Sequence, residues 1–158
     1  MVSTTSQGER IVLSFTWAVA CTSRATALFL FENLFYNVLM QDCIFCKIIK
    51  KESPANIVFK DDVCFVFSPL DPITKGHVLI VPKVHSKNIF DIDANVLAQL
   101  ITITQKVAHD IVDKNKATGV NLLHASGKDA QQSIFHFHFH LVPRYPDDGL
   151  DLWLKNKL

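Results

Sequence analysis

Apolar residues beyond residue 40 follow two spacings, one typical of helices and one typical of strands. From residue 91 to 116 they recur every three or four positions, which predicts a long amphipathic helix capped by Asp91 or Asp93. Gly119 comes soon after this run, and we expect it to end the helix. Residues 43–51 show the same spacing over a shorter stretch, which predicts a short helix.

Short runs rich in β-forming residues lie between and after these helices. Residues 57–60 and 63–67 are joined by two aspartates, so they predict a hairpin. Three more strands are predicted at residues 77–81, 120–124 and 135–142. This order of elements does not repeat a strand–helix–strand unit. It therefore predicts an α+β fold with a mainly antiparallel sheet, one long helix and a short N-terminal helix.

Residues 1–39 differ from the rest of the chain. A polar start is followed by two apolar runs, each shorter than the 18 or so residues that a membrane-spanning helix needs. We expect an N-terminal extension that is disordered or not native, and a single domain at residues 40–158. A targeting signal is an alternative, because Arg10 precedes an apolar stretch and residues 18–20 resemble a cleavage site. A packed helix is a third.

Composition narrows the class of protein. The formal charge is +1 and 49% of the residues are hydrophobic, so no overall field attracts nucleic acid or an acidic membrane. We expect no nucleic-acid partner, and no membrane association for residues 40–158. A domain of this size with an ordinary core does not need disulfides, so its four cysteines favour a reduced, cytoplasmic setting.

Three histidines, His136, His138 and His140, alternate with phenylalanines in the last predicted strand. Successive side chains of a strand point to opposite faces, so the phenylalanines would enter the core. The histidines would then form a row with about 7 Å between successive members. Packing explains such a row poorly. Metal chelation and nucleophilic attack on phosphorus both suit it, and the spacing alone does not choose between them.

The sequence HFHFHLV at residues 136–142 resembles the signature of the histidine triad (HIT) family, in which three histidines alternate with apolar residues. The resemblance covers nearly all of residues 42–146. It includes the family's N-terminal helix and first hairpin, its central strand and turn, and its active loop and triad strand, at residues 42–62, 73–91 and 127–145. The chain is most similar to the small single-domain branch with an N-terminal CxxC.

The resemblance implies a homodimer that binds purine nucleotides. Such proteins cleave at the α-phosphate of phosphoramidates, adenylated compounds or dinucleoside polyphosphates. By resemblance, His138 is the nucleophile that becomes nucleotidylated, and His140 binds phosphate oxygens and assists the leaving group. Ser133 would donate a hydrogen bond there, with Gln132 beside it. The implied substrate-binding residues are Phe45, Ile48, Leu70, Asp71 and His77, although the three apolar ones, taken alone, are more simply core residues.

The same branch of the family implies a structural zinc held by Cys43, Cys46, His85 and His136, a Cys₂His₂ set that suits zinc. His136 would then anchor the segment through the metal while its two neighbours do the chemistry. Two small buried thiols without a metal are the plain alternative. A catalytic zinc on the triad itself is a third, and the cysteine pair makes it the weakest.

Three positions depart from the family pattern and keep a second function open. Gln131 stands where glycine is usual, Pro69 where many relatives carry an acidic residue, and Ala125 where asparagine is frequent. These changes are compatible with a nucleotide-binding regulatory protein whose catalysis is weak or vestigial. His109 and His124 have no partner evident in the sequence, and we assign them no role.

Overall fold

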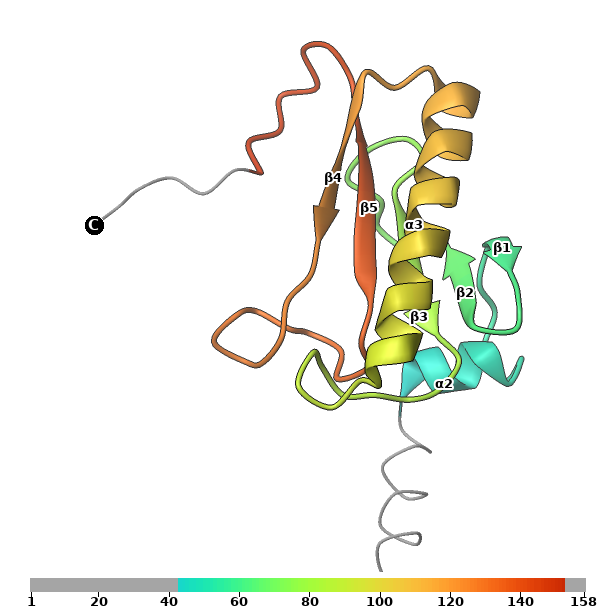
Figure 1. Cartoon of the computed structure of the whole chain (residues 1–158). Coiled ribbons are helices and arrows are strands. Elements are labelled where there is room, and N and C mark those ends of the chain that lie inside the picture. The colour runs from blue at the N-terminus through green and yellow to red at the C-terminus, as the bar shows by residue number, and fades with distance from the viewer. Residues whose placement is uncertain (1–42, 153–158) are drawn as a thin grey trace, which may run out of the picture. The chain divides into compact units, whose positions relative to one another are not determined.

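Five antiparallel strands and two helices make up residues 43–152, the part of the chain that this computed structural model describes (Figure 1). The elements in chain order are α2 (Ile44–Ile49), β1 (Ile57–Lys60), β2 (Cys64–Phe67), β3 (Val78–Pro82), α3 (Ala94–Asn115), β4 (Gly119–Leu123) and β5 (Phe139–Arg144). The predicted extension at residues 1–39 and the domain boundary at residue 40 lie outside the described residues.

The sheet has the strand order β1-β2-β3-β5-β4, and every neighbouring pair is antiparallel. This confirms the predicted α+β fold with an antiparallel sheet and one long helix. β5 comes last in the chain yet lies inside the sheet, where His140 pairs with Leu79 on β3 and with Leu123 on β4. Pairing on both sides makes β5 a rigid carrier for the last histidine of the triad.

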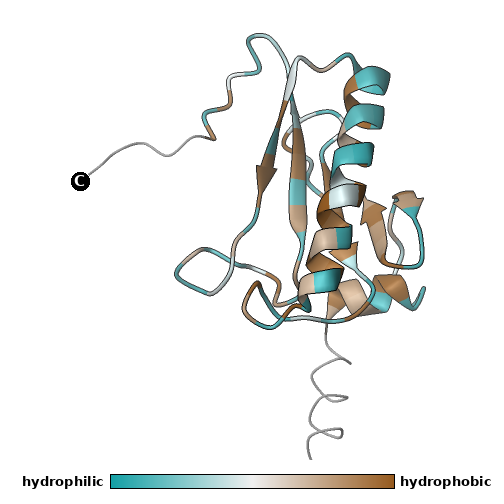
Figure 2. Ribbon diagram, in the orientation of Figure 1, coloured by the Kyte–Doolittle hydropathy of each residue, from teal (hydrophilic) through white to brown (hydrophobic). Residues whose placement is uncertain are grey.

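The long helix α3 begins and ends close to where the sequence predicts, but Gly119 is not the residue that ends it. The Asp93 carboxylate accepts the backbone N–H groups of Asn95 and Val96, as an N-cap does. Hydrophilic and hydrophobic residues alternate along α3, as expected for a two-faced helix (Figure 2). At its C-terminus Lys116 adopts the left-handed conformation with φ of 60°. The expectation that Gly119 ends the helix is therefore wrong: Gly119 begins β4.

Two apolar clusters cover the two faces of the sheet. The larger cluster lies between α3 and the sheet and includes Phe137, Phe139 and Leu141. The smaller cluster joins α2 to the opposite face through Phe45 and Ile48. Alternate residues of β3 enter different clusters, which is the two-residue period of a strand. Both faces of the sheet are thus covered by apolar side chains near residues 135–138, which precede β5.

The predicted strand at residues 135–142 is displaced: β5 starts at Phe139 and runs to Arg144. The pairing of β5 with β3 stops at Phe139 and Ile80, and its pairing with β4 stops at His140 and Leu123, so residues 135–138 lie outside both ladders. Their backbone is held from a turn, because the Phe137 N–H donates to the Ser86 carbonyl oxygen at 2.6 Å. The alternation of side chains continues through this irregular stretch all the same.

Within residues 43–152, no helix is both long enough and apolar enough to cross a membrane.

Candidate active site and metal centre

The last three histidines of the chain alternate with buried phenylalanines. The ring centroid of His138 lies 5.0 Å from that of His140 and 5.2 Å from that of Phe45 on α2. Phe137 and Phe139 point the other way and are 0% and 7% exposed in the cluster under α3. These packed rings fix the direction of the imidazoles, and a site on a rigid support keeps its geometry.

The hydrogen bonds of His138 determine which ring nitrogen carries its proton. Nδ1 lies 2.7 Å from the carbonyl oxygen of His136, which can only accept, so Nδ1–H donates. Nε2 then carries the lone pair. Burial lowers the pKa of His138 below its ordinary value, so the ring is neutral at pH 7. A neutral imidazole with its Nε2 lone pair available is the form that can attack phosphorus.

A chain of two hydrogen bonds fixes the proton of His140. The Ile73 N–H donates to Nδ1 of His77 at 3.3 Å, so a neutral His77 carries its proton on Nε2. That Nε2–H donates to Nδ1 of His140 at 3.1 Å, which leaves the proton of His140 on Nε2. Burial and the neighbouring imidazoles lower the pKa of His140 to about 4, and burial lowers the pKa of His77. His140 therefore offers an N–H donor beside His138.

These neutral rings make folding stability depend on pH in a defined direction. His140 binds its proton at about pH 4 when folded and near 6.5 when unfolded, so the unfolded state holds more protons between those values. Stability therefore falls as the pH drops from 6.5 to 4. Allowing for solvent screening of a partly exposed ring, we expect His140 to contribute about 1–2 kcal/mol to this loss.

Denaturant titrations of the wild type and His140→Gln at pH 7 and pH 4 measure this contribution. The variant should lose less stability than the wild type by that amount. Acid loss at the cysteines and other histidines is common to both proteins and cancels in the comparison. Equal losses in the two proteins would show that His140 is not held neutral by the fold.

Gln132, a predicted catalytic residue, is 6% exposed, and its side-chain amide forms hydrogen bonds with backbone groups. Its Oε1 accepts the Gly127 N–H at 2.8 Å. Its Nε2 donates to the carbonyl oxygens of Lys87 at 2.7 Å and Ile134 at 3.1 Å. Gln132 thus shapes the loop before the histidines, and any part it takes in catalysis acts through that loop.

The loop around Gln132 adopts a conformation for which glycine is preferred. Gln131 has φ of 66°, in the left-handed region that costs a non-glycine residue about 1–2 kcal/mol. Gln131 thus adopts a left-handed backbone conformation although it replaces the glycine that is usual in the family. Ser133 follows on the surface of the same loop, and its hydrogen bond to a substrate stays a prediction.

The predicted substrate-binding residues occupy two different surroundings. Phe45 and Ile48 are buried in the cluster beneath α2, 3% and 8% exposed, and His77 lies against His140. Leu70, with an exposure of 105%, and Asp71 are exposed in the loop between β2 and β3. The structure brings Phe45 and His77 to the histidines, whereas Leu70 and Asp71 extend into solvent. Their contacts with a substrate remain predictions.

The four predicted metal ligands meet at one point. The ligand atoms of Cys43, Cys46, His85 and His136 all lie within 4.8 Å of one another. Nδ1 of His136 is 3.4 Å from Sγ of Cys43 and 3.2 Å from Nδ1 of His85. A tetrahedral zinc with bonds of 2.0–2.3 Å separates its ligands by roughly 3.3–3.8 Å, so the residues present fit this metal.

The protonation of the cluster also fits a metal. Nε2 of His136 lies 2.9 Å from the Pro82 carbonyl oxygen, so Nε2–H donates and the lone pair of Nδ1 faces the cluster. Burial raises the pKa of Cys43, but the neighbouring His136 and His85 imidazoles more than offset this and lower it to about 5. Burial and the Cys43 thiolate raise the pKa of Cys46 to about 12, a value that a bound cation would reduce.

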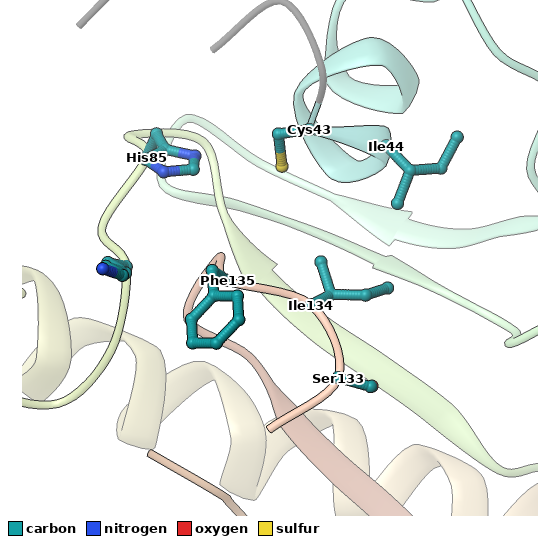
Figure 3. A pocket seen from close by; sticks show the side chains of 7 residues that line it. Cys43, Ile44, His85, Ser133, Ile134 and Phe135 are labelled. Atoms are coloured by element: carbon teal, nitrogen blue, oxygen red, sulfur yellow. The ribbon is translucent and has the colours of Figure 1, made fainter. Parts of the chain in front are cut away.

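A pocket of about 390 Å³ opens beside the metal-ligand cluster (Figure 3). Cys43 and Ile44 enter it from α2, His85 from the turn after β3, and Ser133, Ile134 and Phe135 from the loop before β5. Its seventh lining residue is Lys87, whose Nζ lies 5.4 Å from the centroid of the Phe135 ring. Ser133 therefore connects this mainly apolar pocket to the loop shaped by Gln132.

A family model described as the HIT domain matches residues 50–147, more than half of the 158-residue chain. The chain belongs to the HIT family. An uncharacterized HIT-like protein of Borreliella burgdorferi is 38% identical to this HIT protein over 121 residues, 75% of the chain and 87% of that relative. These findings confirm the family resemblance drawn from the HFHFHLV stretch.

Two named enzymes and two crystal structures are similar to this HIT protein. Adenylylsulfatase HINT3 of Arabidopsis thaliana is 35% identical (77% of this chain, 61% of that one), and adenosine 5'-monophosphoramidase HNT1 of Saccharomyces cerevisiae is 36% identical (65% and 62%). A HIT family protein from Bacillus anthracis matches with a TM-score of 0.69 at 36% identity, covering 73% and 83% of the two chains. A Zn-bound histidine triad family protein from Mycobacterium smegmatis matches with a TM-score of 0.69 at 29% identity (75% and 86%).

Three of the residues found at the site were not predicted from the sequence. Ile44 and Lys87 line the pocket, and His124 contacts the backbone of His138. Ile44 adjoins Phe45 on a predicted helix, so its place near the site could have been anticipated. Lys87 and His124 lie on loops far from the triad in sequence, and only the folded chain brings them there.

Proposed function

We propose that this protein is a nucleotide hydrolase that cleaves at the α-phosphate through a nucleotidyl-histidine intermediate. The observation that carries the proposal is the pair of fixed tautomers, with the lone pair of His138 on Nε2 and the proton of His140 on Nε2. A nucleophile beside a hydrogen-bond donor suits attack on a phosphorus whose oxygens need a donor. The named relatives, an adenosine 5'-monophosphoramidase and an adenylylsulfatase, support a nucleotide substrate.

In the proposed reaction, Nε2 of His138 attacks the α-phosphorus in line with the departing amine, sulfate or phosphate. A bond forms between Nε2 and phosphorus as the bond to the leaving group breaks, and a departing amine takes its additional proton from solvent. The Nε2–H of His140 donates to an oxygen on phosphorus, where negative charge develops. Water then hydrolyses the nucleotidyl-histidine, which releases the nucleotide and restores neutral His138. Ser133, at the edge of the loop, is placed in the proposal as a donor near the leaving group.

The direct test is incubation of the full chain with adenosine 5'-phosphoramidate and chromatographic detection of AMP. We expect steady release of AMP, with turnover in the range of ordinary enzymes, about 1 s⁻¹ or more. The corresponding 5'-phosphoramidates of guanosine and inosine would define the base preference. Tight binding of AMP with no turnover would instead favour the nucleotide-binding regulatory protein that the sequence departures left open.

We further propose that Cys43, Cys46, His85 and His136 hold a structural zinc. The donor set and the orientation of His136 support this, as does the Zn-bound relative from Mycobacterium smegmatis. A closed four-ligand site leaves no position for substrate, so the zinc would act on stability and not on the chemical step. Thiolate ligands need a reducing environment, which agrees with the cytoplasmic setting proposed for this protein.

We propose a homodimer that pairs through β4. β4 is at the edge of the sheet, where backbone N–H and C=O groups are available to another strand. Leu122 pairs with Leu141, so its side chain lies on the face covered by α3, yet Leu122 remains 41% exposed. Val120 is 39% exposed on the same strand. A second copy of β4 would cover these apolar side chains and extend the sheet.

A charge at Leu122 should break this dimer. We expect Leu122→Asp to change the mass measured by light scattering from two chains to one, because a buried unpaired carboxylate costs several kcal/mol. Val58→Asp is the matched control: Val58 is 47% exposed on β1, at the other edge of the sheet, and this variant should stay dimeric. If both variants keep the mass of a dimer, pairing through β4 is wrong.

A further inference from the structure

His124 is the first residue after β4, and its imidazole makes contacts that no part of the proposed chemistry uses. Nδ1 lies 2.8 Å from the carbonyl oxygen of His138, and Nε2 lies 2.6 Å from Oγ of Ser126. The ring packs against Phe137, with centroids 4.3 Å apart. We infer that His124 is a positioning residue, which holds the backbone of the nucleophile in place.

The direction of every proton in this chain of contacts is determined by its two ends. The His138 carbonyl oxygen can only accept, so Nδ1 of His124 carries the hydrogen. At the other end the Ile89 N–H donates to Oγ of Ser126 at 2.9 Å. The Ser126 hydroxyl is then free to donate to Nε2 of His124. A neutral imidazole thus satisfies all of its partners at once.

The place of this hydrogen bond explains why a side chain is needed. The pairing of β4 with β5 ends at Leu123 and His140, so the His138 carbonyl lies beyond the paired part of the sheet. β4 and β5 run side by side up to this point (Figure 1). The imidazole of His124 supplies there the donor that a longer β4 would have offered from its backbone.

The contact bears on catalysis because the His138 ring is oriented through its own backbone. Its Nδ1–H donates to the His136 carbonyl two residues earlier, so a shift of the main chain moves the ring. Residues 136–138 have no ladder to hold them, and His124 restrains this segment from the β4 side. A displacement of about 1 Å at a reacting group can cost on the order of 100-fold in rate. The catalytic consequence rests on the proposed hydrolase function.

Two variants of His124 separate positioning from packing. Leucine keeps the apolar contact with Phe137 and removes the donor, whereas asparagine can place an amide N–H close to the position of Nδ1. With adenosine 5'-phosphoramidate we expect His124→Leu to lower kcat about 30-fold with a change in KM under about 3-fold. His124→Asn should recover most of kcat. His109→Leu, on the exposed side of α3, should match the wild type.

A second readout does not depend on activity. Nitrogen-15 NMR of the imidazoles should show His138 as one Nδ1–H tautomer in the wild type and in His124→Asn, and as a mixture or a broadened signal in His124→Leu. A leucine variant with the kcat of the wild type and an unchanged His138 signal would show that His124 only packs. An inactive wild type with the expected NMR pattern would overturn the hydrolase and leave the positioning role intact.

Discussion

Replacing His138 by alanine should remove nearly all turnover of adenosine 5'-phosphoramidate, a loss of at least about 10³-fold in kcat. The reason is that Nε2 of His138 is the nitrogen whose lone pair the fold leaves available, because Nδ1–H is bound to the His136 carbonyl. We expect AMP still to bind to the variant, since the proposed substrate-binding residues Phe45 and Ile48 are unchanged. His140→Ala should lose less, because the donor it supplies assists the attack and does not form the new bond.

Rapid quenching of the reaction with radiolabelled substrate tests the same assignment directly. Label should attach to the wild-type protein through an acid-labile link that maps to His138, and His138→Ala should carry none. His109→Ala is the matched control, since His109 is exposed on α3. Turnover of His138→Ala at the wild-type rate, or label on another residue, would show that the nucleophile lies elsewhere.

Loss of the zinc should have the largest effect on stability. The purified chain should carry about one zinc, as a closed four-ligand site requires. Cys43→Ser and Cys46→Ser should each bind little or no zinc. We expect their free energy of unfolding to fall by about 3 kcal/mol or more, which lowers Tm by roughly 10 °C or more, because metal binding is linked to folding. A bound zinc would join the start of α2, the turn after β3 and residue 136, three segments distant in sequence.

Cys64→Ser separates the loss of metal from the loss of a buried thiol. Cys64 is 0% exposed, and burial raises the pKa of its thiol to about 12. This variant should lose some stability and keep its zinc, measured by plasma mass spectrometry. A chelator should destabilise the wild type and leave Cys43→Ser unchanged. Metal-free wild type whose melting does not respond to added zinc would rule out the site.

The sequence predicted the elements well where a local pattern determines them. α3 begins at the residue after the Asp93 cap, and the hairpin and the remaining strands lie within about two residues of their predicted places. β5 is the exception, because it starts where backbone pairing with β3 and β4 begins, and the alternation of its side chains does not specify that point. The prediction that Gly119 ends the helix was wrong because Lys116 adopts the left-handed conformation at the C-cap, and no local rule excludes lysine there.

Some features of the site could likewise be predicted from the sequence, and others could not. The meeting of Cys43 and Cys46 with two distant histidines was anticipated through the family resemblance, and the structure brings all four together. The roles of Gln132 and His124 could not be anticipated, since each bonds through its side chain to a backbone carbonyl of another segment, Lys87 and His138 respectively, and no local pattern predicts such a contact. The exposure of Leu70 was also not evident, because a leucine in a loop carries no periodic signal.

The two-residue alternation from His136 to His140 has a consequence for how this stretch can vary in length. His136 is buried on the metal side, Phe137 is buried under α3, and His140 is paired within the sheet, so both ends of the segment are anchored. One inserted residue would turn every later side chain to the opposite face. We therefore expect Phe137 and Phe139 to tolerate only apolar residues of similar size, and a single insertion or deletion between His136 and His138 to separate the proposed metal ligand from the proposed nucleophile.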